Sequence, residues 1–237
     1  MTHITLTFFS LYVHRGIAHK ALIFHPVMEH FIRFWLWLTD GTQIKHWIAM
    51  HRKHHRYTDK AGDPHSPVDC PTVKDKLVYT WKNFYSSVID RYKTSWSQEQ
   101  LAIYGKGVPD DWINRHLYQA YPRCGLIILL SINLLIFGTW GFLAWIIQVL
   151  WTPTFITVVV TVCCHVWGYH NPAANDFSRN IFPIGIFMSG EELHSNHHAD
   201  PANAKFSKQW WEFDLGWCYI TLLKNLGLVT VVHRESK

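Results

Sequence analysis

The chain has 237 residues, with 22 Lys and Arg against 17 Asp and Glu, and its 17 histidines outnumber its 13 glycines. Charged residues make up only 16% of the chain and aromatic residues make up another 16%, which excludes intrinsic disorder. Five Cys are too few for a disulfide scaffold, and an odd number cannot all form pairs. The length suits one domain, residues 1–237. The mean hydropathy of −0.03 is too polar for a mostly lipid-embedded chain and fits a few membrane spans with a large polar part.

The apolar pattern of the N-terminal segment, residues 4–20, predicts that it forms part of a membrane-spanning helix. Its mostly apolar stretch Ile4–Val13 would form about 15 Å of helix, which is half of a bilayer crossing. A basic leader and a small-residue cleavage site are both missing, so the pattern is not that of a signal peptide. The segment has the pattern of a spanning helix that lacks its beginning.

Residues 26–123 predict interfacial and cytosolic helices. The apolar, Trp-rich stretch Phe31–Leu38 is too short to cross a bilayer, which favours an amphipathic helix in the membrane plane. The polar, proline-containing stretch 56–115 predicts a cytosolic insertion with one helix near 73–92. Residues 166–237 predict a cytosolic and interfacial cap with an aromatic helix at 210–226.

The stretch Gly125–Cys164 decides the fold class, because it carries no charge along its whole length. About 20 apolar residues cross a bilayer, so residues 124–165 predict two crossings that meet at a break near 138–141. A buried hairpin of a soluble protein rarely lacks every charge over such a length. We therefore predict an all-α fold in which one complete membrane hairpin and a partial N-terminal helix are capped by a cytosolic helical domain.

Histidines recur with the spacing of metal ligands. The groups are His14 and His19, then His51, His54 and His55, then His194, His197 and His198, with His165 alone at the end of the hairpin. On an α-helix the three histidines of each HxxHH group lie within an arc of about 100°, so they can reach one metal centre. The HxxxxH spacing would place His14 and His19 about 140° apart, so we expect the first helix to end between them, near Gly16.

The predicted topology brings these groups to one face of the membrane. No crossing separates His19 from His51, two separate His55 from His165, and none separates His165 from His194. The basic residues Arg52, Lys53 and Arg56 favour the cytoplasmic side by the positive-inside rule. The same three side chains are candidates for receiving a charged substrate headgroup or an acidic redox partner.

These motifs resemble those of the membrane fatty acid desaturases of the acyl-CoA or acyl-lipid Δ9 type, in their bacterial branch. The resemblance runs from about residue 4 to residue 232 and rests on His14–His19 (HRGIAH), His51–His55 (HRKHH), Gly190–His198 (GEELHSNHH), Phe34–Leu38 (FWLWL) and Trp211–Trp217 (WEFDLGW). It implies an integral, multi-pass protein of a bacterial inner membrane.

The resemblance also implies a di-iron centre. Nine histidines would hold two Fe2+ ions, with His165 as the ninth: His14, His19, His51, His54, His55, His165, His194, His197 and His198. O2 would be the co-substrate, and a saturated acyl chain, carried by CoA or a phospholipid, would gain a cis double bond at Δ9. Electrons would come from a separate ferredoxin or cytochrome b5; no nucleic acid is expected as a partner. Thr161 stands where this family often has an Asn that holds a metal-bound water.

Acidic residues beside the boxes are candidates for orienting the imidazoles, because ligating histidines usually donate their second N–H to a carboxylate. The candidates are Asp59, Asp63, Glu191, Glu192 and Asp200, together with the hydroxyl of Thr161.

Two other functions fit part of the pattern. A hydroxylase of the same histidine-box superfamily, acting on lipids, alkanes or carotenoids, would have a nearly identical iron site. A non-catalytic metal-binding or metal-transport membrane protein would need polar or ionisable residues inside its spans. The uncharged stretch offers only Ser131, Asn133, Gln148 and several Thr, which disfavours transport.

Overall fold

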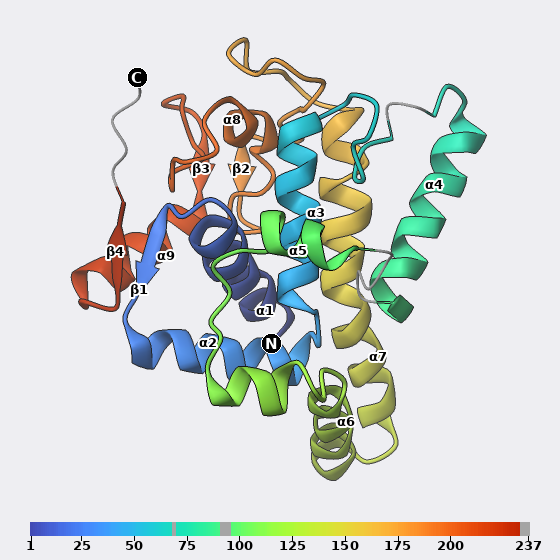
Figure 1. Cartoon of the computed structure of the whole chain (residues 1–237), viewed down its shortest axis with the longest axis vertical. Coiled ribbons are helices and arrows are strands. Elements are labelled where there is room, and N and C mark those ends of the chain that lie inside the picture. Colours follow the sequence, from blue (N-terminus) through green and yellow to red (C-terminus); the bar gives the residue numbers. More distant parts are fainter. Residues whose placement is uncertain (68–69, 91–95, 233–237) are drawn as a thin grey trace.

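The computed structural model describes residues 1–67, 70–90 and 96–232, and it is mostly helical (Figure 1). Helix α1 (Thr2–Phe8) continues directly into a π-helix, η1 (Phe9–Ala18), in which backbone N–H groups bond carbonyls five residues back. The last such bond runs from the His19 nitrogen to the His14 carbonyl, 3.1 Å.

The helix ends between His14 and His19, as expected, but at Ala18, two residues after the expected end near Gly16. A π-helical turn takes about one residue more than the 3.6 residues of an α-helical turn. Residues five apart therefore return to nearly the same face. The wide turns, and not an early helix end, bring His14 and His19 together.

Two helices pack beside this segment. Helix α2 (Pro26–Thr39) begins with a proline at its first position, where the missing N–H costs nothing, and it includes the apolar segment expected at 31–38. Helix α3 (Ile44–Tyr57) stands next to η1 and carries the second histidine group in its last two turns.

The polar insertion forms short helices: α4 (Val73–Tyr85), η2 (Ser86–Asp90), α5 (Gln98–Tyr104) and η3 (Asn114–Tyr118). Capping boxes start α4 at Thr72 and α5 at Ser97, where each hydroxyl accepts the backbone N–H three residues on. The helix expected at 73–92 is thus present as far as Asp90, and its last two residues lie outside the described part of the chain.

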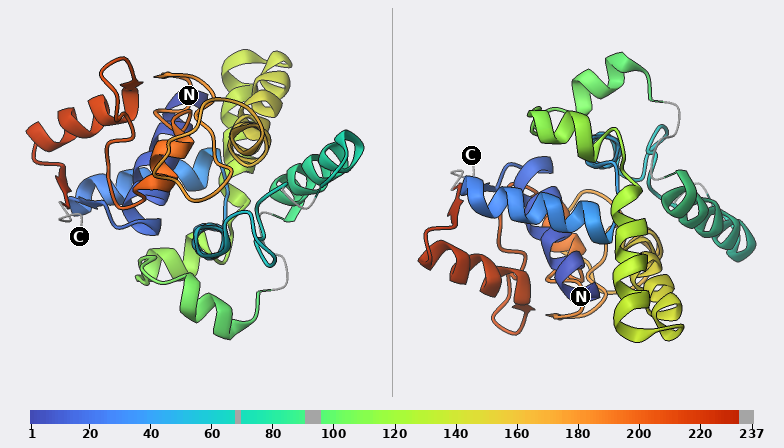
Figure 2. Two further views of the ribbon diagram at one scale, coloured as in Figure 1. Left: turned by 90° about the horizontal axis from the view of Figure 1, so that it is seen from above. Right: turned by 90° about the horizontal axis from the view of Figure 1, so that it is seen from below.

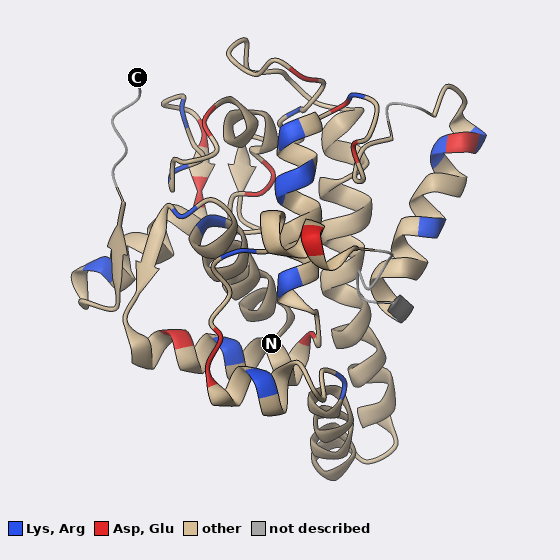
Figure 3. Cartoon of the chain, viewed as in Figure 1, with Lys and Arg blue, Asp and Glu red and all other residues tan. Residues whose placement is uncertain are grey.

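Helices α6 (Cys124–Phe137) and α7 (Trp140–Pro153) lie side by side and are joined at Gly138 and Thr139, where the sequence predicts a break (Figures 1 and 2). Gly141 allows their close approach, since a Cβ there would lie 2.2 Å from the Asn133 carbonyl oxygen. Charged side chains are absent from both helices (Figure 3).

Pro153 ends the regular part of α7. Because proline has no N–H to donate, the chain widens into the π-helix η4 (Thr154–Val160) and closes with a short 3-10 turn, η5 (Cys163–His165). Among the described residues one continuous helical segment, Trp140–His165, is long and apolar enough to cross a bilayer, and α6 is shorter. The two-crossing topology and its sidedness stay predictions.

Four short strands accompany the helices in the described part of the chain. Strand β1 (Leu22–Phe24) pairs antiparallel with β4 (Val229–Val231), and β2 (Ile184–Gly185) pairs parallel with β3 (Phe213–Asp214). They close loops around a mainly helical body, so the all-α expectation describes the bulk of the fold and omits these pairs.

The C-terminal part contains α8 (His194–Ala199) and α9 (Leu215–Asn225). The helix expected at 210–226 begins only at Leu215, because Asp214 caps it by accepting the N–H of Trp217 at 3.0 Å. The residues just before it belong to β3 and its turn.

Arg15 ties η1 to this C-terminal part. Its side chain is fully buried, its guanidinium carbon lies 3.7 Å from the centre of the Phe206 ring, and it pairs with Asp214 at 3.3 Å. It also donates hydrogen bonds to the carbonyls of Ser189 (2.7 Å) and Ala204 (2.9 Å). One guanidinium thus fixes the loops on both sides of the third histidine group against the first.

Candidate metal centre

The structure brings the nine predicted histidines together in two buried groups. In each group one nitrogen per residue lies within 4.8 Å of all the others. The first group is His14, His19, His51, His55 and His197, and the second is His54, His165, His194 and His198. The adjacent residues His54 and His55 fall into different groups, and so do His197 and His198. Helices α3 and α8 therefore each contribute histidines to both groups.

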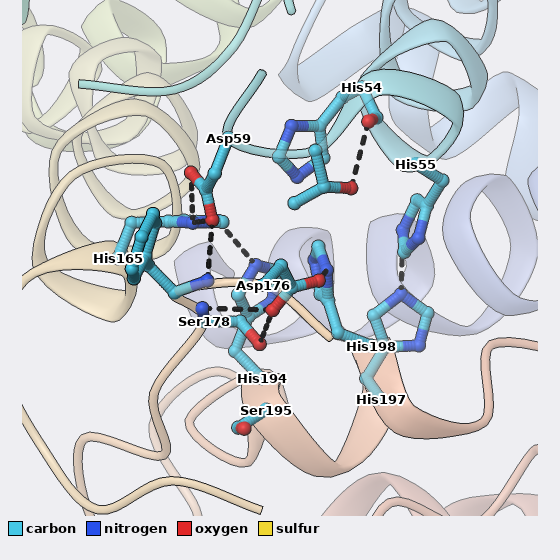
Figure 4. Close-up of polar contacts among 12 residues, drawn as sticks. His54, His55, Asp59, His165, Asp176, Ser178, His194, Ser195, His197 and His198 are labelled. Atoms are coloured by element: carbon cyan, nitrogen blue, oxygen red, sulfur yellow. Dashed lines mark hydrogen bonds and ion pairs between the residues drawn. The ribbon is translucent and has the colours of Figure 1, made fainter. Parts of the chain in front are cut away.

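The spacing within the groups fits metal coordination. The Nε2 atoms of His14 and His197 are 3.0 Å apart. Those of His55 and His197 are also 3.0 Å apart, and those of His165 and His194 are 3.2 Å apart (Figure 4). Two imidazoles at right angles on one metal, with bonds of about 2.1 Å, would place their nitrogens about 3 Å apart. The Nε2 atoms of His54 and His198 are buried and have no hydrogen-bond partner within the described residues. The donor set therefore fits one metal ion per group.

Burial favours the neutral, metal-binding form of six of these imidazoles. Desolvation, followed by the proximity of other imidazoles, lowers the pKa of His19, His51 and His55 well below the usual 6.5. The same causes lower the pKa of His65, His194, His197 and His198. A metal needs the neutral imidazole, whose lone pair is free.

Three of the predicted acids contact the imidazoles. The Nδ1 atoms of His54, His165 and His14 lie 2.9, 3.1 and 2.8 Å from the carboxylates of Asp63, Asp59 and Glu191, respectively. Figure 4 shows the Asp59 contact. In each case Nδ1 donates its proton to the carboxylate, so Nε2 carries the lone pair that faces the group.

The other two predicted acids have different partners. Asp200 pairs with Lys208 at 3.0 Å, and Glu192 accepts the backbone N–H groups of Met188 (2.9 Å) and Gly190 (3.2 Å). Both acids therefore shape the loops around the box and do not touch the histidine rings in these contacts.

Sequence reasoning missed a fourth orienting acid, Asp176. Its carboxylate lies 2.7 Å from Nδ1 of His198 and also accepts the N–H and hydroxyl of Ser178 (Figure 4). Asp176 lies in an irregular loop between the hairpin and the third box. The Asp-x-Ser turn is a weak signal of local geometry, and it does not predict contact with a distant histidine.

Several basic residues lie along α3 (Figure 3), and their surroundings differ. Arg52 donates to the carbonyls of Ile17, Ala18, Tyr104 and Lys106, so its guanidinium connects η1 to the end of α5. Lys53 lies 5.6 Å from the centre of the Trp96 ring, and Arg56 is exposed.

A largely apolar pocket adjoins both histidine groups. Its lining includes four of the histidines, His14, His51, His54 and His194, together with Leu6, Phe9, Phe155, Ile156, Val160 and Met188. Two further polar residues, His65 and Thr161, also line it and contact each other. His65 belongs to none of the histidine motifs of the sequence.

Residues 1–219 match the family described as "Fatty acid desaturase". The chain belongs to the fatty acid desaturase family. Its members are oxidoreductases of lipid metabolism that use iron, and the histidine groups fit a metal site of this kind.

Curated relatives carry related but different names. The chain is 29% identical to Delta-9 acyl-lipid desaturase 1 of Arabidopsis thaliana, over 94% of this chain and 70% of the relative. It is 30% identical to the sn-1 stearoyl-lipid 9-desaturase of Synechocystis, over 92% of this chain and 65% of the relative. It is also 28% identical to the acyl-CoA C20 Delta5-desaturase of Anemone leveillei, over 96% of this chain and 70% of the relative.

Proposed function

We propose that this desaturase introduces a cis double bond, at Δ9, into a saturated acyl chain of a membrane lipid, with O2 as the co-substrate and two irons held by the nine histidines. The observation that carries the proposal is the apolar pocket, because side chains of both histidine groups line its wall. The names of the plant and cyanobacterial relatives support the Δ9 position of the double bond and a membrane lipid as the carrier of the acyl chain.

The chemistry of the bound group explains the histidines. Iron with O2 supplies an oxidant strong enough to remove hydrogen from an unactivated methylene, which no side chain can do. The reaction balances when the acyl chain loses two hydrogens and one O2 becomes two waters, with two electrons and two protons from a separate donor.

The residues of this chain have three tasks in that reaction. Nine imidazoles hold the irons, and Asp59, Asp63, Asp176 and Glu191 fix the rings that face them. The apolar side chains of Phe155, Ile156 and Val160 align a methylene chain against the centre and exclude water.

We place the docking site of the electron donor, a ferredoxin or cytochrome b5, on the basic end of α3. Of the three basic candidates, Arg56 is exposed and Lys53 is partly so, whereas Arg52 is hydrogen-bonded within the fold. Lys53 and Arg56 are therefore the residues through which an acidic partner would be attracted.

Expression in cells that lack acyl desaturation tests the function. Gas chromatography with mass spectrometry should show a new monoene whose double bond lies at C9–C10. The variant His194→Ala, which removes a nitrogen from the second group, should form none. A hydroxylated fatty acid without an alkene would contradict the proposal and point to a hydroxylase.

A further inference from the structure

The two histidine groups differ in size. The first contains five imidazoles and the second four. The ring of a tenth histidine, His65, lies 5.7 Å from that of His54 in the second group, a little farther than the rings of His165 (5.2 Å) and His198 (5.1 Å). His65 is only 5% exposed, and it lines the same pocket as His54 and His194.

The hydrogen bonds around His65 define which of its nitrogens carries the proton. The Thr161 hydroxyl contacts both His65 Nε2 and the Ile156 carbonyl oxygen, the latter at 3.0 Å. A carbonyl can only accept, so the hydroxyl donates to Ile156, and its oxygen accepts the proton of His65 Nε2. A neutral imidazole has a single N–H, so Nδ1 is left with a lone pair.

That lone pair accepts no hydrogen bond from the described residues. His65 Nδ1 is buried and has no hydrogen-bond partner among the described residues. A buried acceptor without a donor destabilises the fold. The loop is nevertheless held in place, because Asp63 accepts both the Nδ1 proton of His54 and, at 2.8 Å, the backbone N–H of His65. One carboxylate thus places a metal-binding histidine and His65 together.

We propose that His65 Nδ1 accepts a hydrogen bond from a water molecule bound to the second metal, in the coordination position that four imidazoles leave to a non-protein ligand. Thr161 fixes the His65 ring for this purpose. His65 is therefore a positioning residue for the water, and it makes this position prefer water over an anion. The inference rests on the proposed metal centre, and it concerns ligand binding there, not turnover.

Azide binding to the oxidised, iron-loaded full chain tests the inference, because azide must displace the water and cannot donate to Nδ1. In His65→Ala the azide Kd should fall about tenfold, as expected for the loss of one strong hydrogen bond to the displaced water. Thr161→Val, which removes the hydroxyl that fixes the ring, should shift the Kd in the same direction. The exposed His116, stacked on Trp112, gives the control His116→Ala, with an unchanged Kd.

The direction of the shift separates this role from simple loosening. A damaged site would bind azide more weakly, so a raised or unchanged Kd in both variants overturns the inference. Iron content is measured alongside, and Thr161→Val decides the matter if His65→Ala binds less iron. A wild-type chain that binds no iron would contradict the proposed function itself, whereas an iron-loaded chain that forms no monoene would leave the azide test intact.

Discussion

Single contacts between imidazoles and carboxylates determine how the histidines of this chain present their nitrogens. His14 illustrates this, because its Nδ1 lies 2.8 Å from Glu191, which also accepts the hydroxyl of Ser10. The neighbouring Glu192 instead bonds backbone N–H groups. Two adjacent glutamates in one motif therefore have different tasks, which the sequence alone does not distinguish.

Replacing Glu191 should weaken iron binding selectively. In Glu191→Gln the amide keeps the size of the side chain but removes the charge that holds the His14 proton, so iron affinity should fall about 10- to 100-fold. Iron retained during dialysis against a graded chelator measures this affinity. The matched control is Asp200→Asn, whose carboxylate pairs with Lys208, and equal iron loss in both variants would argue against the orienting role.

The sequence predicts the histidines of the centre better than the residues that contact and orient them. The HxxHH spacing is sufficient because one helical turn places its members on one face, as α3 and α8 do. Asp176 and His65 lie in irregular loops whose paths depend on packing between distant segments. Local patterns carry no signal for such contacts.

At the scale of elements, two π-helical segments shape the centre. The first, η1, brings His14 and His19 to one face, and the second, η4, follows Pro153 and leads to Thr161 and His165. Sequence patterns based on 3.6 residues per turn cannot anticipate this geometry, so they place the helix end near Gly16, two residues before its end at Ala18. The break at Gly138 and Thr139 was predictable, because glycine punctuates an otherwise apolar run.

Arg15 should contribute more to stability than any exposed ion pair. Arg15→Ala would leave the buried carboxylate of Asp214 without its partner and the carbonyls of Ser189 and Ala204 without a donor, which should lower the free energy of unfolding by about 3–5 kcal/mol. Denaturant unfolding of the purified protein in detergent measures the change.

The control for Arg15 is Arg115, which pairs with Asp110 at the surface, with 58% of its side chain exposed. Arg115→Ala should change the free energy of unfolding by about 0–1 kcal/mol. If the two variants are equally stable, Arg15 does not connect the first and third histidine groups as described.

Across the whole molecule, helices line a pocket whose apolar wall adjoins side chains of both histidine groups. The composition predicts the division between an uncharged hairpin and a histidine-rich polar part, because each has its own sequence signature. Composition does not predict the strand pairs β1–β4 and β2–β3, because each strand has only two or three residues and its partner lies far away in the sequence.

Filling the pocket should remove activity without removing metal. Ile156→Trp places a larger side chain in the lining, so the yield of monoene should fall at least about tenfold while the iron content stays unchanged. Ile147→Trp, on the exposed side of α7 (49% exposed), is the matched control and should retain the yield. A full yield from Ile156→Trp would mean that the acyl chain lies elsewhere.

The iron content of the purified chain tests whether the two histidine groups form a di-iron centre. In a di-iron centre, five of the histidines would hold one metal ion and four would hold the other. Elemental analysis of the full chain, purified from iron-supplied cells and corrected for protein concentration by amino-acid analysis, should give two irons per chain. A saturated value of one iron or none, or an equal preference for a different metal, would contradict a di-iron desaturase.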